Sequence, residues 1–117
     1  MRKLKLAWLF LLCGLPTYGQ HSVVLHWTAS TDAVTYPSLG YNVYRLTTAC
    51  PTGTPTGATK LNATPVSAVT YTDSTVQVGT NCYYVTSTVN GMESAASNLV
   101  AGSPSPAPPT ALTVTVN

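Results

Sequence analysis

The stretch Gly79–Ser94, GTNCYYVTSTVNGMES, decides the fold of this chain. From Cys82 to Val89 its residues are β-branched, aromatic or small, with no glycine, proline or charge, which favours a half-buried β-strand. Asn90-Gly91 then predicts a two-residue type I′ turn, because both central positions need positive φ angles that these two residues tolerate best. The stretch therefore predicts a β-hairpin.

Residues 1–19 have the three parts of a secretory signal peptide: a basic start, an apolar run from Leu6 to Leu15, and a small-residue boundary before Gln20. The apolar run is too short to span a bilayer, so we expect no stable membrane insertion once it is removed. An alternative is a lipoprotein lipidated at Cys13, which the bulky Leu11-Leu12 lead-in disfavours. We expect the remaining 98 of 117 residues to be secreted, extracellular or at the cell surface.

Removal of the signal peptide changes the charge balance, because three of the five basic residues leave with it. The mature part has a net charge of −1, from Arg45 and Lys60 against Asp32, Asp73 and Glu93. No basic face is left to neutralise phosphates, which argues against nucleic acid and anionic membranes as partners. The remaining length suffices for one hydrophobic core.

Short segments with strand-like alternation or β-rich composition recur between turn-rich loops. They are residues 22–28, 41–46, 60–61, 69–72, 82–89 and 96–101. In the first segment Val23, Leu25 and Trp27 share the face that we expect to be buried, and in the second Tyr41 and Val43 point inward. Short strands at regular spacing without helical periodicity predict an all-β, antiparallel β-sandwich.

Several motifs in combination resemble a fibronectin type III domain of the bacterial secreted kind. They are Trp27, GYNVYR at 40–45, YTD at 71–73, and the hairpin with its flanks from Val76 to Asn98. The resemblance covers residues 22–102 and implies an immunoglobulin-like sandwich. We assign residues 20–102 to this domain, 103–109 to a Pro-rich linker and 110–117 to a C-terminal strand.

Cys82 stands where that family usually has the tyrosine that closes the corner before this strand. A thiol replaces the hydroxyl poorly, so something else must hold the corner. In the family's topology the strand before Cys50 runs beside the Cys82 strand, and the resemblance thus implies a Cys50–Cys82 disulfide in an oxidising compartment. The alternatives are free or metal-bound thiols; without a CxxC pair or a histidine at ligand spacing, we expect neither metal nor cofactor.

The first strand of the family, which pairs along the edge of the Trp27 strand, is missing. After the linker SPSPAPP, residues 110–116 (TALTVTV) alternate and look like such an opening strand, with Thr110, Leu112, Val114 and Val116 on one face. One hypothesis is that this strand is donated to a neighbouring copy, which builds a head-to-tail fibre. It could also fold back on its own chain, or be a stub of a following domain in a truncated multi-domain protein.

No pattern predicts catalysis. The carboxylates Asp32, Asp73 and Glu93 lie in different loops, so none are paired by sequence as a general acid and base. His21 and His26 are five residues apart, which places them on opposite sides of a strand. Neither a nucleophile elbow nor a phosphate-binding glycine pattern is present. We therefore expect a non-catalytic structural or binding module.

For a binding role, the resemblance implies that loops at one pole carry recognition. These are the 29–40 loop with an exposed Tyr36, and the hairpin tip from Asn90 to Met92. A polysaccharide-binding interpretation uses Tyr44 and Tyr83, expected on the outer face of adjacent strands, although such a pair more often stabilises the sheet. The expected partners are copies of the chain itself, a polysaccharide or a surface protein.

Overall fold

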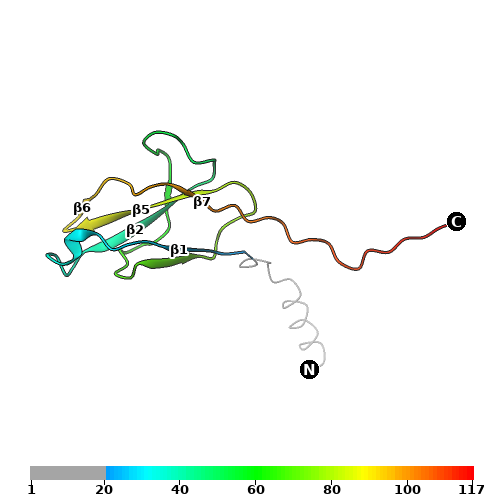
Figure 1. The fold of residues 1–117 in the computed structure, drawn as a ribbon, viewed down its shortest axis with the longest axis horizontal. Coiled ribbons are helices and arrows are strands. Elements are labelled where there is room, and N and C mark those ends of the chain that lie inside the picture. Colours follow the sequence, from blue (N-terminus) through cyan, green and yellow to red (C-terminus); the bar gives the residue numbers. More distant parts are fainter. Residues whose placement is uncertain (1–20) are drawn as a thin grey trace, which may run out of the picture.

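The computed structural model describes residues 21–117, so the predicted signal peptide at 1–19 and the lipidation alternative at Cys13 lie outside the described residues. Figure 1 shows a small β-rich body from which the C-terminal segment extends. The elements are β1 (Val23–His26), η1 (Thr31–Ala33, a 3₁₀ turn), β2 (Gly40–Leu46), β3 (Thr59–Lys60), β4 (Thr70–Asp73), β5 (Cys82–Val89), β6 (Met92–Glu93) and β7 (Val100–Ala101). No helix within 21–117 has the length and apolarity needed to cross a membrane.

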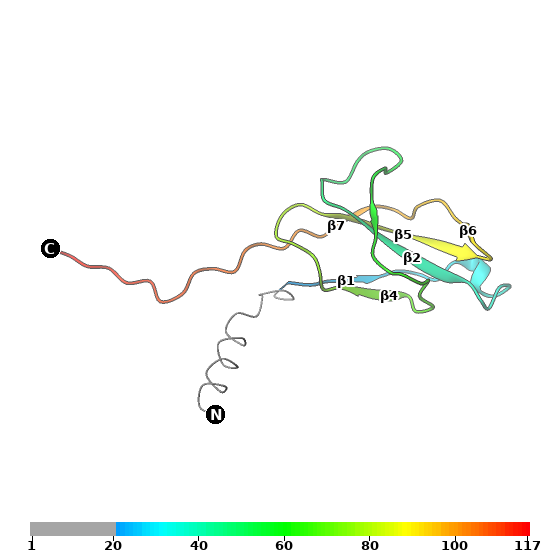
Figure 2. The ribbon, with the colours of Figure 1, turned by 180° about the vertical axis from the view of Figure 1, so that it is seen from behind.

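Two antiparallel sheets pack against each other, which confirms the predicted all-β sandwich (Figures 1 and 2). The smaller sheet pairs β1 with β4, and the larger has the order β3-β2-β5 with β6 and β7 both on the other side of β5. The central pair, β2 and β5, is in register over the whole of β2, from Gly40 opposite Thr88 to Leu46 opposite Cys82. This pair is the frame on which the other elements are placed.

The core lies between the two sheets and is small. Its buried centre is Leu25 from β1, Val43 from β2, Tyr83 from β5 and Val76 from the loop before β5. Trp27 packs at its margin, with its ring edge-on to Tyr41 at a centroid distance of 5.4 Å. The expected inward faces of the first two strands are confirmed, because Leu25, Tyr41 and Val43 are all buried.

The hairpin turn is as predicted, but its second strand differs. Asn90 and Gly91 have φ angles of 51° and 80°, and Val89 pairs directly with Met92. Of the second strand, expected at 96–101, only β7 at its end is a strand, and a short strand, β6, lies before the expected start. Between the pairs Thr88–Glu93 and Cys82–Ala101, β5 advances six residues and the outer segment eight, so two extra residues bulge out of the ladder.

Serine side chains explain how this interrupted segment stays attached to β5. Ser94 Oγ accepts a hydrogen bond from the Ser87 amide, and Ser97 Oγ accepts one from the Val85 amide. Each hydroxyl thus takes the place of a backbone carbonyl where the bulges displace the ladder. A run of alanine and serine residues is weak as a strand former but suits this arrangement.

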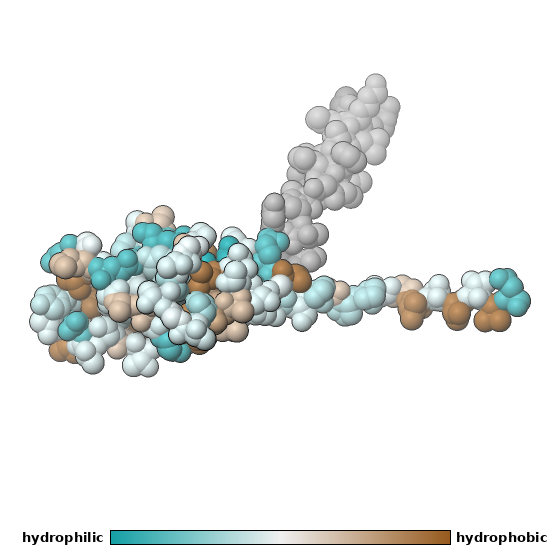
Figure 3. Space-filling model, turned by 90° about the horizontal axis from the view of Figure 1, so that it is seen from above, coloured by the Kyte–Doolittle hydropathy of each residue, from teal (hydrophilic) through white to brown (hydrophobic). Residues whose placement is uncertain are grey.

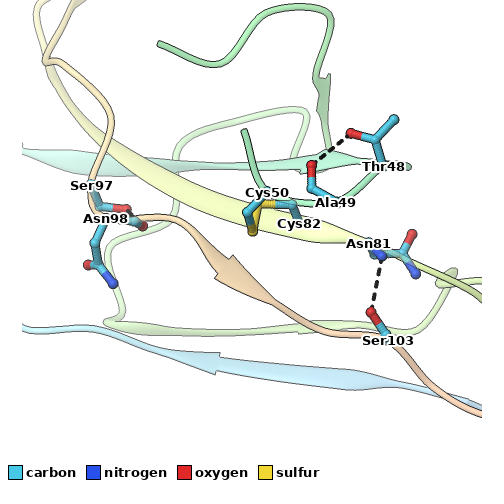
Figure 4. Close-up of a disulfide and its surroundings, with 8 residues drawn as sticks. All are labelled: Thr48, Ala49, Cys50, Asn81, Cys82, Ser97, Asn98 and Ser103. Carbon is cyan, nitrogen blue, oxygen red and sulfur yellow. Dashed lines mark hydrogen bonds between the residues drawn. A yellow bond between two sulfur atoms is a disulfide. The ribbon is translucent and has the colours of Figure 1, made fainter. Parts of the chain in front are cut away.

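Cys50 and Cys82 form the expected disulfide, with their Cα atoms 5.1 Å apart (Figure 4). It ties the loop after β2 to the first residue of β5. The corner before β5 is held by Asn81, whose side-chain amide donates to the carbonyls of Gln77 and Gly79. An asparagine thus holds the bend that the resemblance left without its tyrosine.

Residues 110–116 form no strand in this structure, because β pairing needs a partner and none of residues 21–117 lies beside them. The tail leaves the body at the end where β1 begins, which we call the tail pole (Figure 1). The 29–40 loop and the 90–92 turn lie at the opposite end, the hairpin pole. The tail does not fold back on its own body.

Candidate functional site

The hairpin pole brings together three of the predicted binding residues. Tyr36, Asn90 and Met92 line one open hollow of about 430 Å³. Met92 is 79% exposed and Tyr36 46%, so both side chains are accessible to a partner. The other lining residues combine apolar and acidic groups, namely Asp32, Leu39, Ser87, Val89, Glu93 and Ser94.

The predicted outer aromatic pair is wrong in one member. Tyr83 is fully buried, and the residue opposite Tyr44 on the outer face of β2 and β5 is Tyr84. The rings of Tyr44 and Tyr84 stack with centroids 4.8 Å apart and planes 10° from parallel. The sequence could not tell which of the two neighbouring tyrosines is buried, because the side chain of either can face water. Tyr83 is the buried one because its hydroxyl finds a buried hydrogen-bond acceptor.

That acceptor is Asp73, the last residue of β4. Tyr83 Oη donates to Asp73 Oδ2 at 2.7 Å, and Arg45 Nη1 reaches the same oxygen at 2.6 Å. The other carboxylate oxygen accepts from the amide and hydroxyl of Thr75. Burial opposes ionisation, but the hydrogen bonds from Tyr83, Thr75 and Arg45 hold the pKa of Asp73 below its usual value.

Glu93 makes a second polar cluster, on the outer face. Its carboxylate accepts hydrogen bonds from Asn42, Tyr44 and Thr86. The bonds from Thr86 and Tyr44 hold the pKa of Glu93 below its usual value. Burial and the neighbouring carboxylate raise the pKa of Tyr44 to about 12. All three bonds converge on Oε2, and they fix the hairpin against β2.

The acidic, histidine and cysteine side chains of residues 21–117 form no metal-binding cluster. No group of three or more histidine, cysteine or acidic residues lies together in that range. Asp73 and Glu93 are each engaged by neutral or cationic donors within separate clusters. The contacts of Asp73 join the two sheets, and those of Glu93 join the hairpin to β2.

The apolar residues predicted for strand donation are among the most exposed apolar side chains of the described range. Leu112 is 96% exposed, Val114 84% and Val116 86%. Figure 3 shows hydrophobic residues recurring along one side of the extended tail. Thr110 shares their alternation and is also exposed. An apolar stripe of this kind in water is unusual for a segment without a partner.

Sequence reasoning missed two polar positions that organise the body. Asn62 is buried and replaces part of a strand beside β2, and Trp27 Nε1 is a buried donor without an acceptor among residues 21–117. Asn62 follows the expected edge strand directly, but its inward orientation has no sequence signal. Trp27 was expected to be buried, and only the packing shows that its indole nitrogen is left unpaired.

Comparison with known proteins adds no identity to this geometry. No protein-family model matches the chain, and no curated protein matches it in sequence.

Proposed function

We propose that this chain is an exported, non-catalytic structural module of the fibronectin type III kind that joins copies of itself head to tail through residues 110–116. The observation that carries the proposal is the exposed apolar alternation of Leu112, Val114 and Val116 in a tail that no part of its own body covers. Burying each of these side chains contributes about 1.5–3 kcal/mol. A second copy supplies a partner for such a segment by strand addition.

Export and cell-surface adhesion belong to the same proposal. The basic-apolar-small pattern of residues 1–19 supports export, and the Cys50–Cys82 disulfide is compatible with an oxidising compartment. A disulfide-tied body of low charge with an extended tail suits a repeating extracellular unit better than a free monomer.

The proposal predicts concentration-dependent assembly of the chain produced as residues 20–117. We expect oligomers or fibres by size-exclusion chromatography with light scattering and by electron microscopy. Replacing Leu112, Val114 and Val116 together by serine, the tail-Ser variant, should give monomers, because the apolar gain is lost. This variant keeps Ser103 and Pro104, which hydrogen-bond the body.

The matched control changes the opposite face of the same tail. Replacing Thr113 and Thr115 by serine preserves the apolar stripe and should leave assembly intact. A wild-type chain that stays monomeric at high concentration, with a protease-sensitive tail, would show that the tail is a stub and not a connector.

The second candidate function is binding of a polysaccharide or surface protein at the hairpin pole. The hollow that gathers Tyr36, Asn90 and Met92 favours it. We expect the tail-Ser variant to retain such binding on a glycan array or in a polysaccharide pull-down, and Tyr36→Ala to weaken it by about tenfold through loss of a stacking surface. If neither the wild-type chain nor the tail-Ser variant binds any glycan, the polysaccharide-binding function is wrong and only the assembly function remains.

A further inference from the structure

The smaller sheet has an edge that pairs with no other strand of residues 21–117. Within residues 21–117, β1 pairs with β4 alone. The Trp27 amide donates to the Val69 carbonyl, so the backbone groups of Trp27 point toward β4. Because these groups alternate along a strand, those of Val23 and Leu25 also point toward β4. The backbone N–H and C=O groups of Val24 and His26 therefore point to the open side. Such an edge is a template for another strand.

A groove runs along this open edge, between β1 and the segment 94–100 that follows the hairpin. It consists of two adjoining hollows that share Trp27, Val85 and Ser97. The hollow toward Thr28 has a volume of about 160 Å³, and the one toward Leu25 about 80 Å³. The lining that carries the argument is apolar, from Leu25, Trp27, Tyr83, Val85 and Val100. We call this the β1 groove.

We infer that the β1 groove accepts residues 112–116 of a second copy, running antiparallel to β1. This inference rests on the proposed strand donation and names its acceptor. In this arrangement Leu112, Val114 and Val116 face inward beside Trp27, Leu25 and Val23, while Thr115 and Thr113 hydrogen-bond the free backbone groups of Val24 and His26. That list of pairs follows from aligning the apolar faces of two antiparallel strands.

The sizes of the hollows agree with this direction. Antiparallel addition places Leu112, the largest of the three apolar side chains, at the larger hollow near Thr28, and a valine at the smaller one. Parallel addition would place Leu112 at the opposite end, beside Val23.

The exit of the tail favours a second copy over the chain's own groove. The Ser103 hydroxyl accepts from the Asn81 amide, and the Pro104 carbonyl accepts from the Gly79 amide, so the linker starts along the corner before β5 (Figure 4). It then leaves at the tail pole, whereas an antiparallel donor must enter the groove at the hairpin pole. A return within the same chain would run parallel to β1, after a reversal in a stiff Pro-rich linker.

Disulfide trapping with a synthetic peptide of residues 107–117 tests the inference. The acceptor is the 20–117 chain carrying the tail-Ser substitutions, with Val24→Cys or His26→Cys added; the peptide carries Thr113→Cys or Thr115→Cys. We expect the pairs 113–26 and 115–24 to cross-link about tenfold faster than 113–24 and 115–26, because a disulfide requires Cα atoms within about 7 Å.

Trp27 supplies an independent readout, because it is the only tryptophan of residues 20–117 and the peptide has no aromatic residue. Peptide binding to the tail-Ser acceptor without added cysteines should shift the Trp27 emission to shorter wavelength. A control peptide with serine at 112, 114 and 116 should leave the emission unchanged.

The outcomes separate this inference from the function on which it rests. Suppose that the wild-type chain assembles through its tail, but the pairs 113–24 and 115–26 cross-link faster, or neither β1 cysteine reacts with the peptide. The acceptor assignment is then wrong, and strand donation uses another surface. If the chain stays monomeric while the expected pairs form, the groove assignment holds and the fibre proposal fails. If neither occurs, both are wrong.

Discussion

At the scale of single residues, Asp73 joins the two sheets through its side chain. It ends β4 in the smaller sheet, and its partners Arg45 and Tyr83 come from β2 and β5 in the larger one. The Asp73 side chain is 2% exposed and that of Arg45 15%, so neither charge is freely solvated. Removing one partner of such an ion pair leaves the charge of the other partly buried without a counter-charge, which destabilises the fold.

We expect Asp73→Asn to lower the free energy of unfolding at pH 7 by about 3 kcal/mol, the cost of leaving Arg45 without its counter-charge. Tyr83→Phe removes one hydrogen bond but keeps the ion pair, and should cost about 1 kcal/mol. Urea unfolding followed by Trp27 fluorescence measures both. Equal losses for the two variants would show that the ion pair adds nothing to the hydrogen bond.

The same residue gives the fold a defined acid sensitivity. Because the folded-state pKa of Asp73 is lowered, its stabilisation is present above the unfolded value of about 3.9 and is lost as pH falls through the folded value. Unfolding curves between pH 6 and 2 should therefore show a smaller acid-induced loss for Asp73→Asn than for the wild type. Some loss remains, because the pKa of Glu93 is lowered too.

At the scale of elements, Asn62 shows how a side chain continues a sheet. β3 pairs with β2 at Tyr44 and Arg45, the Leu61 amide just after β3 donates to the Val43 carbonyl, and the following backbone contact is the bridge between Tyr41 and Val66. Asn62 fills the interval: its Oδ1 accepts from the Val43 amide at 2.8 Å, and its Nδ2 donates to the Tyr41 carbonyl at 3.0 Å. A side-chain amide thus supplies the bonds of a missing strand residue.

We expect Asn62→Ala to destabilise the fold by about 2–3 kcal/mol, because the buried Val43 amide loses its acceptor. Hydrogen exchange at the Val43 amide should speed up more than at the other amides of β2. Lys60→Ala, at an exposed position of β3, is the control and should change stability by less than about 0.5 kcal/mol. Unchanged exchange at Val43 would exclude this role for Asn62.

At the scale of the whole molecule, the two ends are different in kind. The tail pole carries an extended apolar segment (Figure 3). The hairpin pole carries the entrance to the β1 groove and the hollow around Tyr36. A contact between unlike surfaces of identical copies is heterologous, and such contacts give open chains unless a rotation closes them into a ring. The proposed assembly therefore has a direction.

Local chemistry alone determined much of this protein: Asn90-Gly91 dictated the turn, the β-branched run of 82–89 dictated the central strand, and the apolar alternation marked both the core strands and the tail. The resemblance supplied the Cys50–Cys82 pairing. Only the tertiary structure decided which of Tyr83 and Tyr84 is buried, because the carboxylate that accepts the Tyr83 hydrogen bond, Asp73, lies in the other sheet.

The same reason explains the rest of what the sequence left open. The division of the last strand into β6 and β7, the inward position of Asn62 and the hollows along β1 depend on distances between segments far apart in the chain. A strand period fixes which side chains share a face, but not which face finds a partner. That choice is made when the two sheets pack together.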